Sequence, residues 1–108
     1  MTITPSATVA GHRVTRSFGL VYGNTIRARH VGRDILAALK NVVGGEIEEY
    51  TKLMAEAREQ AIDRMVSQAT GRGANAVINV TFSTSYIMGS ASEILAYGEA
   101  VTLERDAQ

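Results

Sequence analysis

The hydrophobic and polar positions of this chain follow the order strand, helix, strand, strand. Alternation of side chains predicts strands over Val14–Ile26, Asn75–Ile87 and Glu93–Glu104. Between the first two strands, apolar residues recur at helical spacing from Glu46 to Thr70. The stripe consists of Ile47, Tyr50, Met54, Ala57, Ala61 and Met65. The pattern therefore predicts one long amphipathic helix between the first and second strands.

The long helix carries signals at both ends. Glu46, Glu48 and Glu49 fall in its first turn, where carboxylates complement the helix dipole. Gly71 is the predicted C′ residue, because glycine adopts the left-handed conformation that ends many helices. A second, short helix is predicted over residues 34–43, with Asp34 as its N-cap.

In the first strand, alternation places Val14, Phe18, Leu20 and Tyr22 on one face and Ser17, Gly19, Val21 and Gly23 on the other. The glycines predict that another element packs closely against the second face. Gly23 and Asn24 could instead form a turn. In the second strand, Ala76, Ile78, Val80 and Phe82 are expected to share a face.

The third strand is apolar on both faces. Ile94, Ala96, Gly98 and Ala100 form a small face, and Leu95, Tyr97, Val101 and Leu103 form a large one. One helix covers only one face of a three-stranded sheet, so the other face needs a partner. The simplest partner is a second copy of the chain. We therefore predict an obligate homo-oligomer.

Composition narrows the class of protein. A chain of 108 residues predicts a single domain over residues 1–108. It contains no cysteine, which excludes disulfides and thiolate metal sites, and no apolar run long enough for a membrane span. The N-terminus lacks the features of a signal peptide, so a soluble cytoplasmic protein is expected. Bases predominate before residue 44 and acids after it. The two halves are expected to neutralise each other within the fold or between subunits, and nucleic acid is not an expected partner.

Several motifs resemble one family. The long helix looks like the helix signature of the YbjQ family, and the residues that carry this resemblance are Gly44-Gly45-Glu46, Tyr50, Glu56-Ala57-Arg58 and Arg64-Met65. The segments Gly73–Val77 and Ala96–Val101 are similar to that family's second and closing strands. The resemblance implies an α+β, β-α-β-β subunit in a dodecin-like two-layer sandwich. In such a subunit the last strand is expected to lie centrally in a three-stranded sheet that is covered on one face by the helix. The resemblance also implies a homopentamer assembled with short extra strands, and the family carries a heavy-metal-binding label.

One residue departs from the family pattern. Where the family usually has Gly-Thr-Ala-Val, this chain has Gly98-Glu99-Ala100-Val101. Glu99 is expected on the same face as Tyr97, where its carboxylate needs a partner or water. Arg16 on the first strand is one candidate partner, and a water-filled channel is the alternative.

The candidate ligand-binding or interface residues are Arg58, Glu46, Glu99 and Tyr97. Arg58 lies at the edge of the apolar stripe, where it could extend to solvent, pair with Glu46 or Glu99, contact a neighbouring subunit, or bind an anion. The candidate metal ligands are His30 and Asp34, four residues apart; two ligands do not make a site, so no metal centre is predicted from the residues. A divalent metal follows from the family label alone.

Two functions remain open at this point. The first is a ring-forming module that binds a metal or small anion at subunit interfaces. The second is an interaction or scaffold protein without a small ligand. No Ser-His-Asp or Cys-His set is available, so we do not expect an enzyme.

Overall fold

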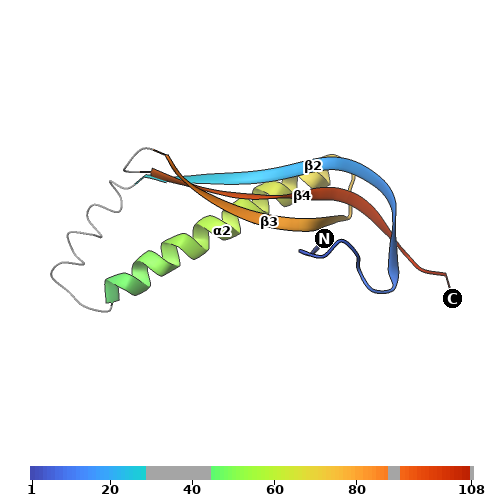
Figure 1. Cartoon of the computed structure of the whole chain (residues 1–108), viewed down its shortest axis with the longest axis horizontal. Coiled ribbons are helices and arrows are strands. Elements are labelled where there is room, and N and C mark those ends of the chain that lie inside the picture. Colours follow the sequence, from blue (N-terminus) through green and yellow to red (C-terminus); the bar gives the residue numbers. More distant parts are fainter. Residues whose placement is uncertain (29–44, 88–90, 108) are drawn as a thin grey trace.

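The computed structural model describes residues 1–28, 45–87 and 91–107. In this part of the chain the elements are β1 (Thr2–Ile3), β2 (His12–Ala28), α2 (Gly45–Gly71), β3 (Ala76–Ile87) and β4 (Ala91–Arg105). The sheet forms one layer and α2 runs along one side of it (Figure 1). The long helix and the three long strands are where the sequence predicted them. The short helix predicted over residues 34–43 lies outside the described residues.

The sheet has the strand order β1-β3-β4-β2, so the last strand lies between the two other long strands as predicted. It contains four strands and not three, because β1 pairs in parallel with β3 at Thr2↔Ala76 and Ile3↔Val77. Thr4 extends this contact: its N–H donates to Val77 O at 3.0 Å, and its carbonyl oxygen accepts from Val80 N at 3.0 Å. A two-residue strand has no alternation to detect, which explains why the pattern did not predict it.

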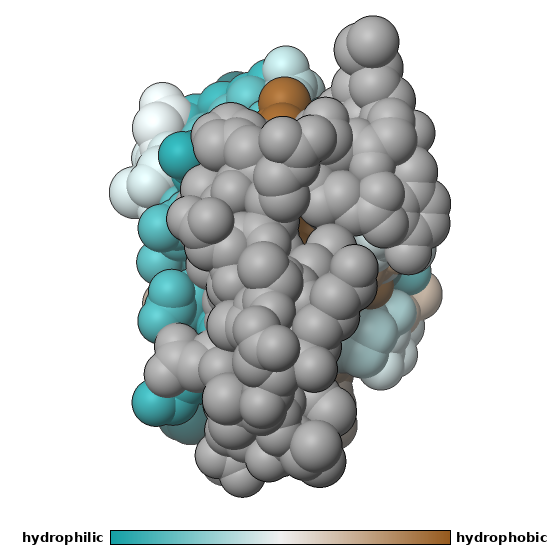
Figure 2. All heavy atoms as spheres, turned by 90° about the vertical axis from the view of Figure 1, so that its left-hand side faces the viewer, coloured by the Kyte–Doolittle hydropathy of each residue, from teal (hydrophilic) through white to brown (hydrophobic). Residues whose placement is uncertain are grey.

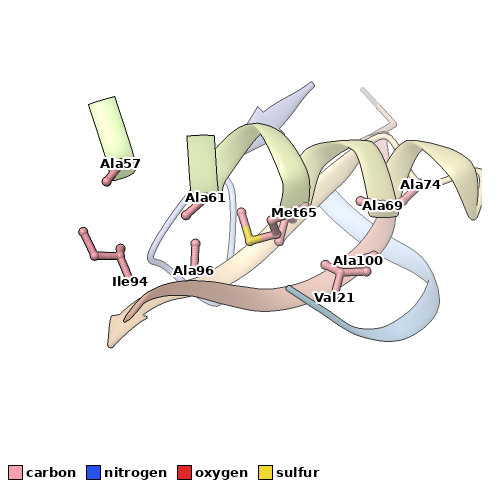
Figure 3. Packing of buried hydrophobic residues seen from close by; sticks show 10 residues of the cluster. Val21, Ala57, Ala61, Met65, Ala69, Ala74, Ile94, Ala96 and Ala100 are labelled. Atoms are coloured by element: carbon pink, nitrogen blue, oxygen red, sulfur yellow. The ribbon is translucent and has the colours of Figure 1, made fainter. Parts of the chain in front are cut away.

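The core lies between α2 and one face of the sheet. Figure 3 shows Ala61 and Met65 of α2 directed toward the strands. The buried cluster joins the helix, the small face of β4 and single residues elsewhere: Val21, Ala57, Ala61, Met65, Ala69, Ala74, Val77, Ile94, Ala96 and Ala100. The predicted stripe is confirmed where side chains are described, and alanine at most of its positions allows the helix to approach the sheet closely.

Gly23 makes the closest approach between the two layers. It pairs with Ala96 inside β2, so it does not form a turn. A Cβ atom added to Gly23 would overlap the carbonyl oxygen of Ala61, the backbone nitrogen of Met65 and the Cβ of Arg64. The predicted close contact at this glycine is confirmed, and the contacting element is the backbone of α2.

The C-terminus of α2 is formed by a Schellman motif that is centred two residues later than predicted. Ala74 N donates to Ala69 O at 3.1 Å and Gly73 N donates to Thr70 O at 3.0 Å, the pattern in which Gly73 is C′. Gly73 has a φ of 90°, whereas Gly71 is still helical. Glycine is the usual residue at C′, so Gly71 and Gly73 were both suitable by residue type. The hydrogen bonds show that Gly73 occupies this position.

Register shifts occur at three places in the sheet, one of them between Val14 and Arg16, and the other two are β-bulges that correct the predicted faces of the first two strands. The β2–β4 register shifts between Ser17 and Gly19, so Phe18 packs against the core while Leu20 lies on the opposite face. The β3–β4 register shifts between Ile78 and Thr81, so Val80 packs against the cluster under α2, whereas Ile78 belongs to a second buried cluster with Ala76 and Val101. An extra residue in one strand reverses the alternation beyond it, which a strict period of two does not anticipate.

Asn79 forms the second bulge. It has a φ of 55°, the left-handed region that asparagine tolerates better than most residues. Its N–H donates to Ser6 O at 3.0 Å, so the N-terminal segment holds the bulge from outside the sheet. Gly98 of β4 lies opposite, and a Cβ atom there would be 2.8 Å from the carbonyl oxygen of Ile78.

The outer edge of β2 is hydrogen-bonded by a row of side chains that we call the edge row: Arg64 and Gln68 of α2, and Arg72, the first residue after the helix. Arg72 Nη1 donates to Leu20 O at 2.7 Å and to Phe18 O at 3.2 Å. Gln68 Oε1 accepts from Tyr22 N at 2.8 Å, and Arg64 donates to Asn24 O.

The edge row fits the strand because two repeats match. Four helical residues rise about 6 Å, and two strand residues advance about 6.6–6.8 Å. Each side chain of the edge row therefore lies level with the next peptide group on the outer edge of β2. Backbone groups that would otherwise be free for another strand are thereby occupied.

Candidate binding surface on the open face

The sheet face opposite α2 carries large apolar side chains that solvent reaches. Leu20, Tyr22 and Ile26 of β2 are 62%, 49% and 56% exposed. The β2–β4 register places Leu95, Tyr97 and Glu99 of the central strand beside them. We call this surface the open face and define it by Leu20, Tyr22, Asn24, Ile26, Glu93, Leu95, Tyr97 and Glu99. It is the large face of β4, as predicted, and α2 lies on the other side of the sheet.

The exposed side of α2 is charged. Lys52, Glu56, Glu59 and Asp63 are exposed on α2, away from the core. On the sheet side, the β3 residues paired with Tyr97 and Leu95 are the exposed polar Thr81 and Ser83. Figure 2, seen from the left-hand end of Figure 1, shows hydrophilic residues along the left of the view, and both hydrophilic and hydrophobic residues along the right. The apolar open face is therefore not part of a generally apolar surface.

Glu99 is held by a hydroxyl group. Ser17 Oγ donates to Glu99 Oε2 at 2.8 Å, and Gly19 N in turn donates to Ser17 Oγ at 3.2 Å. The bulge at Phe18 produces this arrangement, because it brings Ser17 and Leu20 to the same face as Glu99. Glu99 is half-buried, and its expected position beside Tyr97 is confirmed.

Arg16 is not the partner of Glu99. It lies opposite Thr102, one register position away from Ser17, and its guanidinium carbon is 4.7 Å from the centre of the Phe18 ring. Neighbouring strand residues point to opposite faces, so Arg16 and Ser17 cannot both reach Glu99. The sequence pattern placed Arg16 on the wrong face because it did not include the bulge.

A second carboxylate lies farther along the central strand. Glu93 Oε2 accepts from Asn24 Nδ2 at 3.2 Å, in a partly buried hydrogen bond. Sequence reasoning did not select Glu93, Ser17 or Asn24 as site residues. Glu93 could have been found from its even spacing to Tyr97 and Glu99, but Ser17 and Asn24 depend on a strand register that the sequence does not give.

Two hollows form one groove on the open face. The first, of about 380 Å³, is lined by Ser17, Gly19, Leu20, Asn79, Tyr97, Gly98 and Glu99. The second, of about 490 Å³, is lined by Leu20, Tyr22, Asn24, Glu93, Leu95 and Tyr97. They share the lining residues Leu20 and Tyr97, so the two hollows adjoin, and we call them together the groove. Tyr22 and Tyr97 are directly paired in its centre.

Arg58 lies on the other side of the sheet. It is exposed on α2, whereas Glu99 belongs to the face that α2 does not cover. The ion pairs within the described residues are those of Arg13 with Glu104 and Asp106, at 3.3 and 4.0 Å. The proposed pairing of Arg58 with Glu99 is therefore absent from this part of the chain. The side chain of Glu46 lies outside the described residues.

The described residues provide no cluster of three or more His, Cys, Asp or Glu side chains that could hold a metal ion. His12 is exposed, and its Nδ1 is 3.0 Å from Ala10 O. His30 and Asp34, the candidate ligands from the sequence, lie outside the described residues. Within the described ranges, no helix is long and apolar enough to cross a membrane.

Comparison with known proteins gives consistent matches over nearly the whole chain. The sequence pattern of a family described as "Putative heavy-metal-binding", YbjQ, matches residues 1–104. A UPF0145 protein of Dehalococcoides mccartyi is 57% identical over 104 residues, which are 96% of this chain and 100% of that protein. A UPF0145 protein of Archaeoglobus fulgidus is 55% identical over 101 residues, 94% of each chain.

A crystal structure from Pediococcus pentosaceus is similar in fold. It is described as a protein with unknown function of the DUF74 family, and the match has a TM-score of 0.63 at 14% sequence identity. It covers 96% of this chain and 98% of the other. At this identity the match concerns the fold alone.

Proposed function

This chain belongs to the YbjQ, or UPF0145, family of uncharacterised proteins, and we propose that it is a homo-oligomeric ring, a pentamer, that binds a small charged ligand where subunits meet. The observation that carries this proposal is the open face. It combines exposed Leu20, Tyr22 and Ile26 with two carboxylates, Glu93 and Glu99.

Self-association is supported by the shape of the single chain. Its radius of gyration is 17.7 Å, against about 13 Å for a compact domain of about this length. An elongated two-layer subunit leaves much of its sheet exposed, and contiguous apolar surface of this kind is typical of interfaces. The edge row occupies the outer edge of β2, so contacts through the open face or the β3 side are favoured over strand addition at β2.

The charge of the open face favours a cation over an anion as the ligand. From Ser17 to Ile26 and along the β4 residues opposite them, the charged side chains on this face are Glu93 and Glu99. A metal ion would need oxygen ligands from several subunits, because one chain supplies no cluster among its described residues. A ring could provide them by repeating Glu99 around its axis.

The alternative is a scaffold or interaction protein without a small ligand. The same exposed apolar side chains support it, since an interface between subunits needs no ligand to bury them. Neither function is catalytic. His12 contacts a backbone carbonyl oxygen and lacks a described carboxylate that would orient it as a general base.

Native mass spectrometry of the untagged protein, purified without added metal, tests the proposal. We expect a single assembly of five subunits with a co-purified ligand mass. Leu20→Glu, which places a charge at a 62% exposed site of the open face, is expected to dissociate the assembly. Ser67→Glu, which adds the same charge at an exposed site of α2, is the matched control and is expected to leave it intact.

A folded monomer at micromolar concentration would contradict the ring. An intact ring without ligand would favour the scaffold. Equilibrium dialysis against zinc, copper and nickel tests whether the ligand is a metal ion. If the intact ring takes up none of these ions with submicromolar affinity, metal binding is removed from the proposal.

A further inference from the structure

The two carboxylates of the open face lie at the two ends of one apolar groove. Glu99 belongs to the hollow at one end and Glu93 to the hollow at the other. Each accepts a hydrogen bond from a neutral group, Ser17 Oγ and Asn24 Nδ2 respectively. Neither takes part in an ion pair within the described residues. Each carboxylate therefore retains acceptor capacity for a cationic donor.

The distance between the Glu93 and Glu99 carboxylates limits the length of a ligand that can contact both of them. Glu93 and Glu99 are six residues apart on β4, a span of about 20 Å between their Cα atoms. A single metal ion or a compact dication cannot contact both carboxylates over that distance. A ligand that satisfies both must be elongated and must carry a positive charge at each end.

The residues between the two acids indicate the chemical character of the central part of such a ligand. Leu20, Leu95 and the paired Tyr22 and Tyr97 line the space between the two acids. Aliphatic and aromatic side chains suit methylene groups, and tyrosine ring faces also attract ammonium groups. A hydrated inorganic ion would gain little from this surface.

We propose that the open face binds linear aliphatic diammonium ions of the polyamine class. One ammonium group pairs with Glu99 beside Ser17, the other pairs with Glu93 beside Asn24, and the methylene chain lies over Leu20 and Tyr97. This inference specifies the ligand class of the site proposed above and rests on the open face as the ligand surface.

Isothermal titration calorimetry with a length series tests it. The untagged protein is titrated with 1,4-diaminobutane, 1,8-diaminooctane and 1,12-diaminododecane at 0.15 M salt. Affinity is expected to rise with length, because only the longer ions approach the span between Glu93 and Glu99. 1-Aminooctane and 1,8-octanediol are expected to bind at least about threefold more weakly than the diamine of equal length, as the loss of one partly exposed ion pair implies.

Substitutions locate the site. Glu99→Gln and Glu93→Gln are each expected to weaken binding of 1,12-diaminododecane by about threefold to fivefold and to remove its advantage over the monoamine. Glu56→Gln, which removes one exposed carboxylate of α2, is the control with the same change in net charge and is expected to have no effect. A flat length series, or an equal effect of all three substitutions, would overturn the inference.

The subunit count, measured on the same samples by native mass spectrometry, separates this inference from the proposed ring. A pentamer that binds no diamine overturns the diamine inference and leaves the ring. A monomer that binds the length series as described supports the diamine site and contradicts the ring. If Glu93→Gln and Glu99→Gln change the subunit count and no diamine binds, a second copy covers the face and the inference fails.

Discussion

Gly23 of β2 lies directly against Ala61 of α2, with no side chain between the strand and the helix backbone. A Cβ atom at Gly23 would overlap the carbonyl oxygen of Ala61. The relationship fixes the distance between the two layers of the fold at one point. Since the obstacle is backbone, a rotamer change cannot relieve the overlap.

We therefore expect Gly23→Ala to lower the free energy of unfolding by about 1–3 kcal/mol, the range for overpacking a core. Gly71→Ala is the matched control, because an added Cβ there meets nothing within 4 Å. It is expected to be neutral or slightly stabilising. Urea denaturation measures both, and equal effects of the two substitutions would contradict the close contact.

The bulge at Asn79 gives a second prediction. Asn79→Val is expected to lower the free energy of unfolding by about 1–2 kcal/mol, because a β-branched residue is strained at a φ of 55°. Asn79→Gly accepts this conformation and is expected to stay within about 0.5 kcal/mol of the parent. If valine were tolerated as well as glycine, the backbone at this position would not be left-handed in solution.

The edge row gives a third prediction. Arg72→Met removes the hydrogen bonds to Leu20 O and Phe18 O while keeping an unbranched chain of similar reach. We expect a loss of about 1 kcal/mol and faster hydrogen exchange in β2. Arg58→Met, at an exposed arginine of α2, is the control and is expected to change neither. Unchanged exchange in Arg72→Met would show that the edge row does not hold the strand.

Glu99 gives a fourth prediction. Glu99→Thr introduces the residue that the family resemblance implies at this position and removes a half-buried carboxylate from an apolar face. We expect the free energy of unfolding to be unchanged or to rise by up to about 1 kcal/mol, because threonine is favoured in strands. Chemical denaturation checks this. A loss above about 1 kcal/mol would instead mean that the Ser17–Glu99 hydrogen bond supports the fold.

The sequence predicted the elements well because their signals are local. The helix stripe through Ala57, Ala61 and Met65 and the two apolar faces of β4 follow from the periodicity of the side chains. The central place of β4 was implied by the family resemblance and agrees with its two apolar faces. The pairing of β1 with β3 did not follow from the periodicity, because it rests on backbone hydrogen bonds from two residues that carry no pattern.

The candidate surface was predicted only in part. Tyr97 and Glu99 were placed on one face, but Arg16 and a water-filled channel were the alternatives considered for the Glu99 carboxylate, and its partner in the structure is Ser17. One extra residue at Phe18 reverses the faces beyond it, and nothing in an alternating pattern marks where a strand will bulge. Arg58 was expected near the site, and the sheet separates it from Glu99.

The edge row has a consequence for how this fold can vary in length. Arg64, Gln68 and Arg72, the last of them directly after α2, reach β2 only while their spacing keeps them on one side of the helix axis. Inserting or deleting one residue between them would rotate the later members by about 100° around the helix. The peptide groups of β2 that they bind would then be free to pair with strands of other molecules, which is a route to aggregation. Changes of length are therefore expected to accumulate in the connections and not in this half of the helix.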